Sequence, residues 1–137
     1  MIPRAQHHRA VFEAWSIAVE ARHASALAKL NVPSGVFLPP DGRPIKGPAA
    51  IRESWRQWFT LPRLSLSFCR IESLLYPSGD IASGNSAYVL TYGEPGNRVR
   101  DEGRLLVVAV KTEDQWGIRF NAFFSDAYLW LARDLAS

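Results

Sequence analysis

Residues 35–55 read GVFLPPDGRPIKGPAAIRESW, and this stretch decides how the chain is divided between strand and helix. Residues 36–38 are a short apolar run typical of a strand, and residues 43–46 can return beside it. Between them, residues 40–42 (Pro-Asp-Gly) favour a tight turn, because Pro presets φ and Gly accepts a left-handed conformation. Prolines cannot donate a ladder hydrogen bond, so we expect this strand pair at the edge of a sheet.

A helix is predicted to begin directly after the strand pair. Gly47 takes the N-cap and Pro48 the first helical position, where its missing N–H is not needed. Apolar side chains then recur at helical spacing and form one stripe, made of Ile51, Trp55, Trp58 and Phe59. A phosphate-binding loop would need a Lys followed by Ser or Thr at fixed spacing, which GPAAIRES lacks. The glycines and prolines are therefore interpreted as local geometry rather than as a ligand-binding loop.

The segments before this stretch have the helical period. Over residues 5–22 the apolar side chains recur three and four apart, at Phe12, Trp15, Ala18 and Val19. A second, shorter helix is expected over residues 24–30, with Pro33, Ser34 and Gly35 stopping it.

Beyond residue 62 the apolar period changes to two, which is typical of strands. We expect strands over residues 64–69, 81–92, 104–111 and 115–125, with a bulge near residues 70–71. In the last strand one face would carry Trp116, Ile118, Phe120, Ala122 and Phe124. A short amphipathic helix is expected over residues 127–135. Helices followed by hairpin-connected strands predict an α+β fold, with an antiparallel sheet curled around the helices.

The composition indicates one globular domain over residues 1–137. Five Trp in a chain of this length predict a core or an apolar pocket rich in aromatic rings. The single cysteine, Cys69, excludes an internal disulfide, and its apolar surroundings in the sequence predict a buried, inert thiol. The three histidines do not supply the three or four converging ligands of a zinc site, so neither a metal nor a cofactor is expected.

Charge and hydropathy argue against two classes of partner. The net charge of +3 comes from 16 basic and 13 acidic side chains, and the basic ones are scattered singly rather than gathered in a patch. Nucleic-acid binding is therefore not expected. No stretch has the apolar length of a signal peptide or a membrane span. We expect a cytoplasmic protein that binds neither nucleic acid nor a membrane.

Several short motifs follow one another in an order shared with known proteins. They are FLPPDG and GPAAI within residues 37–51, GDIA at 79–82, YVLT at 88–91, DEGRLLVV at 101–108, WGI at 116–118 and SD at 125–126. On these residues the chain resembles the SnoaL-like and ketosteroid isomerase-like proteins of the nuclear transport factor 2-like superfamily. More narrowly, it resembles a group of small bacterial domains of unknown function. The resemblance covers residues 8–126.

The resemblance implies a cystatin-like cone with an apolar pocket at its wide end. It also implies a homodimer that pairs through the outer face of the sheet. Related proteins include isomerases, cyclases, dehydratases and hydrolases, among which the fold alone does not choose. This chain departs from the ketosteroid isomerases, because Leu38 or Pro39 stands where those enzymes carry a catalytic Asp. The first helix likewise offers Phe12 and Trp15 rather than a tyrosine.

The candidate site residues follow from these patterns. The expected pocket lining is Trp15, Phe37, Trp55, Phe59 and Tyr88, with Asn121 as the polar contact. The same rings are also consistent with an ordinary core. The candidate catalytic groups are Asp101 and Asn121. Asp101 begins a strand and is either a solvated hairpin residue or an acid at the pocket rim, while Asn121 within an apolar strand needs a structural or a ligand partner.

The leading interpretation is a protein that binds a small apolar or aromatic molecule. One alternative is an isomerase, cyclase or hydrolase that uses Asp101 or Asn121 with a tyrosine. Another is an associative domain whose pocket is filled by its own rings. A perturbed acid in the pocket would favour the enzyme, an open pocket with amides would favour binding, and a filled one association. We also expect a homodimer through the sheet, because the strands carry more large apolar side chains than one inner face can bury.

Overall fold

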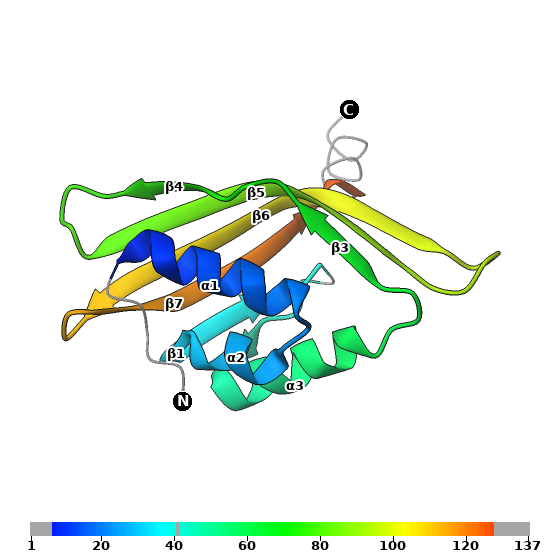
Figure 1. The fold of residues 1–137 in the computed structure, drawn as a ribbon, viewed down its shortest axis with the longest axis horizontal. Coiled ribbons are helices and arrows are strands. Elements are labelled where there is room, and N and C mark those ends of the chain that lie inside the picture. Colours follow the sequence, from blue (N-terminus) through cyan, green and yellow to red (C-terminus); the bar gives the residue numbers. More distant parts are fainter. Residues whose placement is uncertain (1–6, 41, 128–137) are drawn as a thin grey trace.

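The computed structural model describes residues 7–40 and 42–127 of the chain. Within them, helices pack on one large sheet (Figure 1). In chain order the elements are α1 (His8–Glu20), α2 (Ala24–Lys29), β1 (Asn31–Leu38), β2 (Ile45–Lys46), α3 (Pro48–Phe59), β3 (Ser65–Phe68), β4 (Glu72–Leu75), β5 (Ile81–Tyr92), β6 (Val99–Thr112) and β7 (Gln115–Ser125). Asp41 lies outside the described residues, as does the helix expected over 127–135 beyond its first residue.

The sheet has the strand order β2-β1-β7-β6-β5-β3, and β4 also pairs with β5. All these pairs are antiparallel except β1 with β7, which run parallel with Phe37 opposite Asn121. The expectation of an antiparallel sheet is therefore wrong for this one pair. The two strands lie near opposite ends of the chain, so no hairpin turn sets their relative direction.

The opening stretch folds as its residue types predict. β1 and β2 pair with Val36 opposite Lys46, and the Gly42 N–H donates to the Pro39 carbonyl at 2.9 Å to close the turn. Gly47 has φ +88°, a conformation that suits glycine, and α3 follows it with Pro48 in the first turn. The predicted helix boundaries, 48 to 59, are confirmed. The strand itself is longer than expected, because β1 begins at Asn31 and includes the residues taken as a helix stop.

The core lies between the helices and one face of the sheet. The sheet curves around α1, and all three helices lie on its concave side (Figure 1). Along β5 the buried residues alternate, as at Tyr88 and Leu90, and they face the buried stripes of α1 and α3. The expected α+β architecture is confirmed. In residues 7–40 and 42–127, no helix is both long and apolar enough to cross a membrane.

A bulge in β7 changes which side chains reach the core. Val108 pairs with Phe120 and Ala109 pairs with Ile118, so Arg119 is left over between them. After the bulge, Asn121 and Phe123 point inward, and Phe124 is 45% exposed. The expectation that Trp116, Ile118, Phe120, Ala122 and Phe124 share one face is therefore wrong, because one extra residue shifts the alternation.

The outer face of the sheet is only partly covered in the single chain. The apolar run in β6 predicts burial on both faces, yet Leu106, Val108 and Val110 are half-buried while their neighbours are buried. Phe124 and Leu74 on the same side are 45% and 59% exposed. Burial on both faces is thus wrong for the isolated chain, because the described helices all lie on the other face.

The sheet edge formed by β3 and β4 is interrupted at residues 69–71. This break matches the bulge predicted near residues 70–71. Cys69 stands at the break and is exposed, so the expectation of a buried thiol is wrong. Strand alternation alone would not place Cys69 inside, since Phe68 beside it is the residue that packs on the core.

Candidate functional site

The aromatic residues predicted to line a pocket form one contacting cluster. The Trp55 ring stacks on Phe37 at a centroid distance of 5.0 Å and on Phe59 at 5.5 Å. It also meets the edge of Trp15 at 6.1 Å. Tyr88 joins through Phe123, at 5.0 Å. Rings from α1, α3, β1, β5 and β7 therefore meet on the concave face of the sheet.

Phe123 belongs to the aromatic cluster but is not among the predicted lining residues. It contacts Trp15, Phe37 and Trp55 at centroid distances of 6.0 to 6.4 Å. The uninterrupted alternation assumed for β7 placed Phe124 inside instead. Only the bulge at Arg119, which has no clear signal in the sequence, brings Phe123 to the centre of the cluster.

The cluster leaves little open space. Trp15 and Tyr88 are each 1% exposed, and Trp55 is 4% exposed. Beside them lies a cavity of about 10 Å³, roughly the room for one water molecule. Its lining residues are Phe37, Pro40, Trp55, Trp58, Leu66, Leu90 and Phe123. The predicted pocket is therefore largely filled by its own rings in this conformation.

Two buried polar atoms in this region have no hydrogen-bond partner. They are the indole Nε1 of Trp15 and the amide Oδ1 of Asn121. Asn121 is 3% exposed, and it lies opposite Phe37 in the β1–β7 pair and two residues before Phe123. Buried polar atoms are normally satisfied, so each orphan marks a place where a partner is missing.

The second predicted catalytic candidate, Asp101, belongs to a different cluster. Its Oδ2 accepts a hydrogen bond from the Tyr88 hydroxyl at 2.6 Å, and its Oδ1 accepts one from the Ser125 hydroxyl at 2.5 Å. Ser125 Oγ in turn accepts from the Ala127 N–H at 3.2 Å. Asp101 is thus a partly buried group within β6 rather than a solvated hairpin residue.

Gly103 makes this cluster possible. It lies between Tyr88 and Ser125 in the sheet, paired with both. A Cβ built on Gly103 would lie 1.9 Å from the backbone oxygen of Phe124, a distance that no side chain tolerates. The bare backbone therefore lets β6 and β7 approach closely where Asp101 gathers its partners.

The electrostatics of this cluster favour a structural role. Burial, followed by the hydrogen bond and the charge of Asp101, raises the pKa of Tyr88 well above its ordinary value. The phenol therefore stays protonated and donates, and both oxygens of the carboxylate are already engaged. The arrangement joins β5, β6 and β7, and we assign it no proton-transfer step.

The two catalytic candidates do not share a site. Asn121 pairs with Val107, which is six residues from Asp101 along β6. At the rise of an extended strand this separation is about 20 Å. A single reacting group could not touch both side chains at once.

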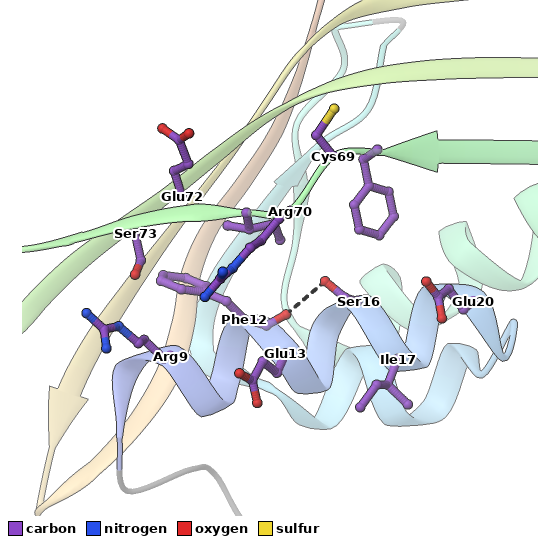
Figure 2. Close-up of a pocket in the computed structure, with 12 residues that line it drawn as sticks. Arg9, Phe12, Glu13, Ser16, Ile17, Glu20, Cys69, Arg70, Glu72 and Ser73 are labelled. Carbon is purple, nitrogen blue, oxygen red and sulfur yellow. Dashed lines mark hydrogen bonds between the residues drawn. The ribbon is translucent and has the colours of Figure 1, made fainter.

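A much larger hollow lies elsewhere, in a groove of about 800 Å³ between α1 and the edge segment 68–73 (Figure 2). It has none of the predicted site residues in its lining. Hydrophobic periodicity locates buried faces, whereas this groove depends on where the sheet edge stops, so no sequence signal pointed to it.

Comparison with known proteins gives a fold but no family assignment from sequence. No protein-family model matches the chain, and no curated protein matches it. An uncharacterised protein with a cystatin-like fold from Caulobacter vibrioides matches with a TM-score of 0.74 at 19% identity, over 88% of this chain and 90% of that one. The chain has the cystatin-like fold of nuclear transport factor 2-like proteins. The resemblance inferred from the motifs is confirmed at the level of the fold.

Two further structures show the range of proteins with this nuclear transport factor 2-like fold. One is a nuclear transport factor 2-like protein from Novosphingobium aromaticivorans, with a TM-score of 0.65 at 17% identity, over 83% of this chain and 76% of that one. The other is a ketosteroid isomerase-like protein from Erwinia carotovora atroseptica, with a TM-score of 0.66 at 16% identity, over 85% and 91%. At these identities the neighbours show a shared fold.

Proposed function

We propose that the aromatic cluster binds a small, neutral, mostly apolar or aromatic molecule. The observation that carries this proposal is the pair of orphaned buried polar atoms, Trp15 Nε1 and Asn121 Oδ1, which belong to residues next to the rings but outside the lining of the small cavity. Leaving a buried donor or acceptor unsatisfied costs about 1–3 kcal/mol. A core built only for stability would carry apolar atoms at these positions. We therefore interpret the two unpartnered atoms as hydrogen-bonding sites for a ligand.

The two orphaned atoms also indicate the chemistry of the ligand. The indole N–H of Trp15 calls for an acceptor on the ligand, and Asn121 Oδ1 calls for a donor. The cavity lining is apolar, so a charged ligand would lose its hydration without an ionic partner there. A neutral ring with one hydroxyl group offers both a donor and an acceptor.

Binding requires the cluster to open, because about 10 Å³ holds no organic molecule. Three members of the cavity lining are half-buried: Pro40 after β1, Trp58 from α3 and Leu66 from β3. Outside the cavity, Trp58 meets only the edge of Tyr92 among the rings, at 6.2 Å. We propose that the ligand enters by displacing Trp58, and that this takes place in the cytoplasm, where the exposed Cys69 would stay reduced.

The proposal is tested with β-naphthol and its methyl ether, which differ by one hydroxyl donor. We expect β-naphthol to shift the indole N–H resonance of Trp15 in a nitrogen-15 spectrum, with assignment through Trp15→Phe. In Asn121→Leu the affinity for β-naphthol should fall about fivefold, the value of one net hydrogen bond, while the affinity for the ether stays the same. Circular dichroism must first show that the variant is folded.

Two results would count against this pocket. One is an unchanged Trp15 indole resonance at saturating β-naphthol. The other is an equal loss of affinity for β-naphthol and the ether in Asn121→Leu, since the amide would then act only through packing. Ser54→Ala on α3, outside the cavity lining, serves as the control and should bind both compounds like the parent.

A second function, association through the sheet, is favoured by the outer face. Its half-buried residues Leu106, Val108 and Val110 lie beside the exposed Phe124. We propose that a second copy covers this face in a two-fold contact. Sedimentation should then give about twice the 15.3 kDa of one chain, and Phe124→Glu should shift the equilibrium toward monomer. A parent protein that stays at one chain mass at micromolar concentration would contradict the proposal.

A further inference from the structure

A long groove runs between α1 and the free edge of the sheet (Figure 2). One wall is six consecutive residues, 68–73, and the other is the face of α1 from Arg9 to Glu20. Arg9, Ser16 and Glu20 point from the helix toward the strand segment, and Arg70 and Ser73 point back toward the helix (Figure 2). The groove shares no lining residue with the aromatic cavity, so it is a separate site.

The strand wall offers unused backbone hydrogen-bonding groups. Within the described residues, β3 and β4 both pair with β5 and with no other strand. A strand paired on one side presents a row of free N–H and C=O groups on the other. Sheet edges of this kind accept an extended peptide as an additional strand.

The dimensions of the two walls match each other and match a short peptide. The eleven-residue step from Arg9 to Glu20 spans about 17 Å along a helix. Residues 68–73 span up to about 20 Å, with a break at residues 69–71 between the end of β3 and the start of β4. An extended peptide of five to seven residues therefore fits the length of the groove and can pair with the strand residues at both ends of the break.

Two exposed apolar side chains belong to the helix side of this groove. Leu74 faces the outer side of the sheet and is not one of them. Ile17 lines the groove and is 66% exposed, and Leu75, two residues after Ser73 on the same face of β4, is 45% exposed. Their exposure is costly in water and is consistent with a surface that receives a partner.

The groove lining carries charges of both signs, on Arg9, Glu13, Glu20, Arg70 and Glu72, and α1 contributes opposite charges at its two ends. Arg9 lies at the end near Ser73, and Glu20 lies at the end near Cys69 (Figure 2). The ion pairs found among the described residues involve neither of these groups. A bound segment would therefore gain from an acidic side chain at the Arg9 end and a basic side chain at the Glu20 end.

We propose that this groove binds an extended peptide segment of a partner protein as an added strand along residues 68–73. Its alternate side chains are apolar and rest on Phe12 and Ile71. An acidic residue lies at the Arg9 end and a basic residue at the Glu20 end. The proposal is independent of ligand binding in the aromatic cluster.

The test uses two fluorescein-labelled heptapeptides, Glu-Val-Thr-Val-Thr-Val-Lys and the reversed order, because either strand direction can pair. We expect at least one to bind with a dissociation constant below about 1 mM. Each peptide is also made in two forms, N-methylated at the valines or at the threonines. Only one set of amides can face the sheet edge, so one form should lose at least about tenfold in affinity and the other should bind like the parent peptide. Hydrogen exchange should slow at backbone amides within residues 68–73.

Two matched pairs of variants locate the site. Ser16→Phe fills the groove from α1 and should lower the affinity about tenfold, whereas Ser54→Phe on α3 should not. Glu20→Lys should weaken binding about threefold by removing the acidic end, whereas Glu113→Lys makes the same change of charge in a distant turn and should have no effect. Near-ultraviolet circular dichroism confirms that each variant is folded.

Several outcomes would overturn the proposal. They are no binding of either peptide at about 1 mM, an equal effect of both N-methylation patterns, or equal effects of Ser16→Phe and Ser54→Phe. Protection of the same amides in the peptide-free protein that rises with protein concentration would show that a second copy covers the edge, and would also overturn it. Changes confined to Trp15 and Trp55 would assign the peptides to the aromatic cluster instead.

Discussion

The aromatic cavity and the groove beside α1 are opposites. The aromatic cavity measures about 10 Å³ and is lined by aromatic rings from α3, β1 and β7. The groove beside α1 measures about 800 Å³, lies open, and mixes guanidinium, carboxylate and apolar groups. The cavity is a small packing gap inside the core, whereas the groove lies at the edge of the sheet. Each therefore suits a different partner: a small neutral ring for the first, a backbone for the second.

This difference predicts how each region responds to change. Residues around the cavity are held by packing on several sides, so a truncation there affects the whole fold. Residues along the groove are solvated on one side and can change at little cost in stability. Three measurements test this difference in tolerance to substitution.

The largest effect is expected for Trp55→Ala at the centre of the cluster. Trp55 contacts Trp15, Phe37, Phe59 and Phe123, so its removal leaves a cavity lined by rings. We expect the free energy of unfolding in urea to fall by about 3–5 kcal/mol. The matched change Ile17→Ala in the groove wall should stay within about 0.5 kcal/mol of the parent. Similar losses in both variants would show that the groove wall is as much a part of the core as the cluster.

A smaller effect is expected for Tyr88→Phe, which removes the hydroxyl that Asp101 accepts. Losing this hydrogen bond to a charged group should lower the free energy of unfolding by about 1.5–3 kcal/mol at neutral pH. The pKa of Tyr88 is raised in the folded state, so the unfolded chain loses the phenolic proton first as pH rises. The parent should therefore lose stability relative to Tyr88→Phe above about pH 10, by up to about 1.4 kcal/mol for each pH unit. If the difference in free energy of unfolding between the parent and Tyr88→Phe stays constant from pH 7 to pH 11, the raised pKa of Tyr88 is contradicted.

The smallest effect is expected at Cys69, exposed in the groove wall. Cys69→Ser should change the free energy of unfolding by less than about 0.5 kcal/mol. The thiol itself reports on occupancy, since it should react with a disulfide reagent in the folded protein and react more slowly when a heptapeptide is bound. β-Naphthol should leave the rate unchanged. Slowing by β-naphthol alone would place the small ligand in the groove and reverse the comparison.

Much of the fold follows from local patterns in the sequence. The third helix was predicted from Gly47, Pro48 and the apolar stripe to Phe59, and it has those boundaries. The strands β5 and β7 have the predicted boundaries as well. These features depend on turn chemistry and on hydrophobic period, both of which act over a few residues. The parallel pairing of β1 with β7 depends on contacts between distant segments, which no local pattern encodes.

The candidate site was predictable to a similar degree. Large rings on inward stripes meet in the core, so Trp15, Phe37, Trp55, Phe59 and Tyr88 come together as the helical and strand periods suggest. Whether these rings leave an open space between them depends on side-chain volumes and rotamers, which hydrophobic periodicity does not predict.

Two features of the site could not be predicted in the same way. The residue types left the environment of Asp101 open between a solvated hairpin end and a pocket rim, because hairpin length, and thus the start of β6 at Val99, could not be read from them. The groove could not be predicted because it lies along a sheet edge. Which strand forms that edge depends on pairing between distant segments rather than on local residue types.

The bulge at Arg119 also has a consequence for how the gene can change. Arg119 is the surplus residue of β7, exposed and without a partner in β6. Deleting its codon would leave a strand in which Ile118, Asn121 and Phe123 still face inward, because regular alternation then carries each to its present side. Deleting the codon of Leu106 in the opposing strand would instead turn one half of β6 inside out. A library of single-codon deletions, scored by the yield of folded protein, should retain the first and lose the second, so the length of this strand is free to vary at one place.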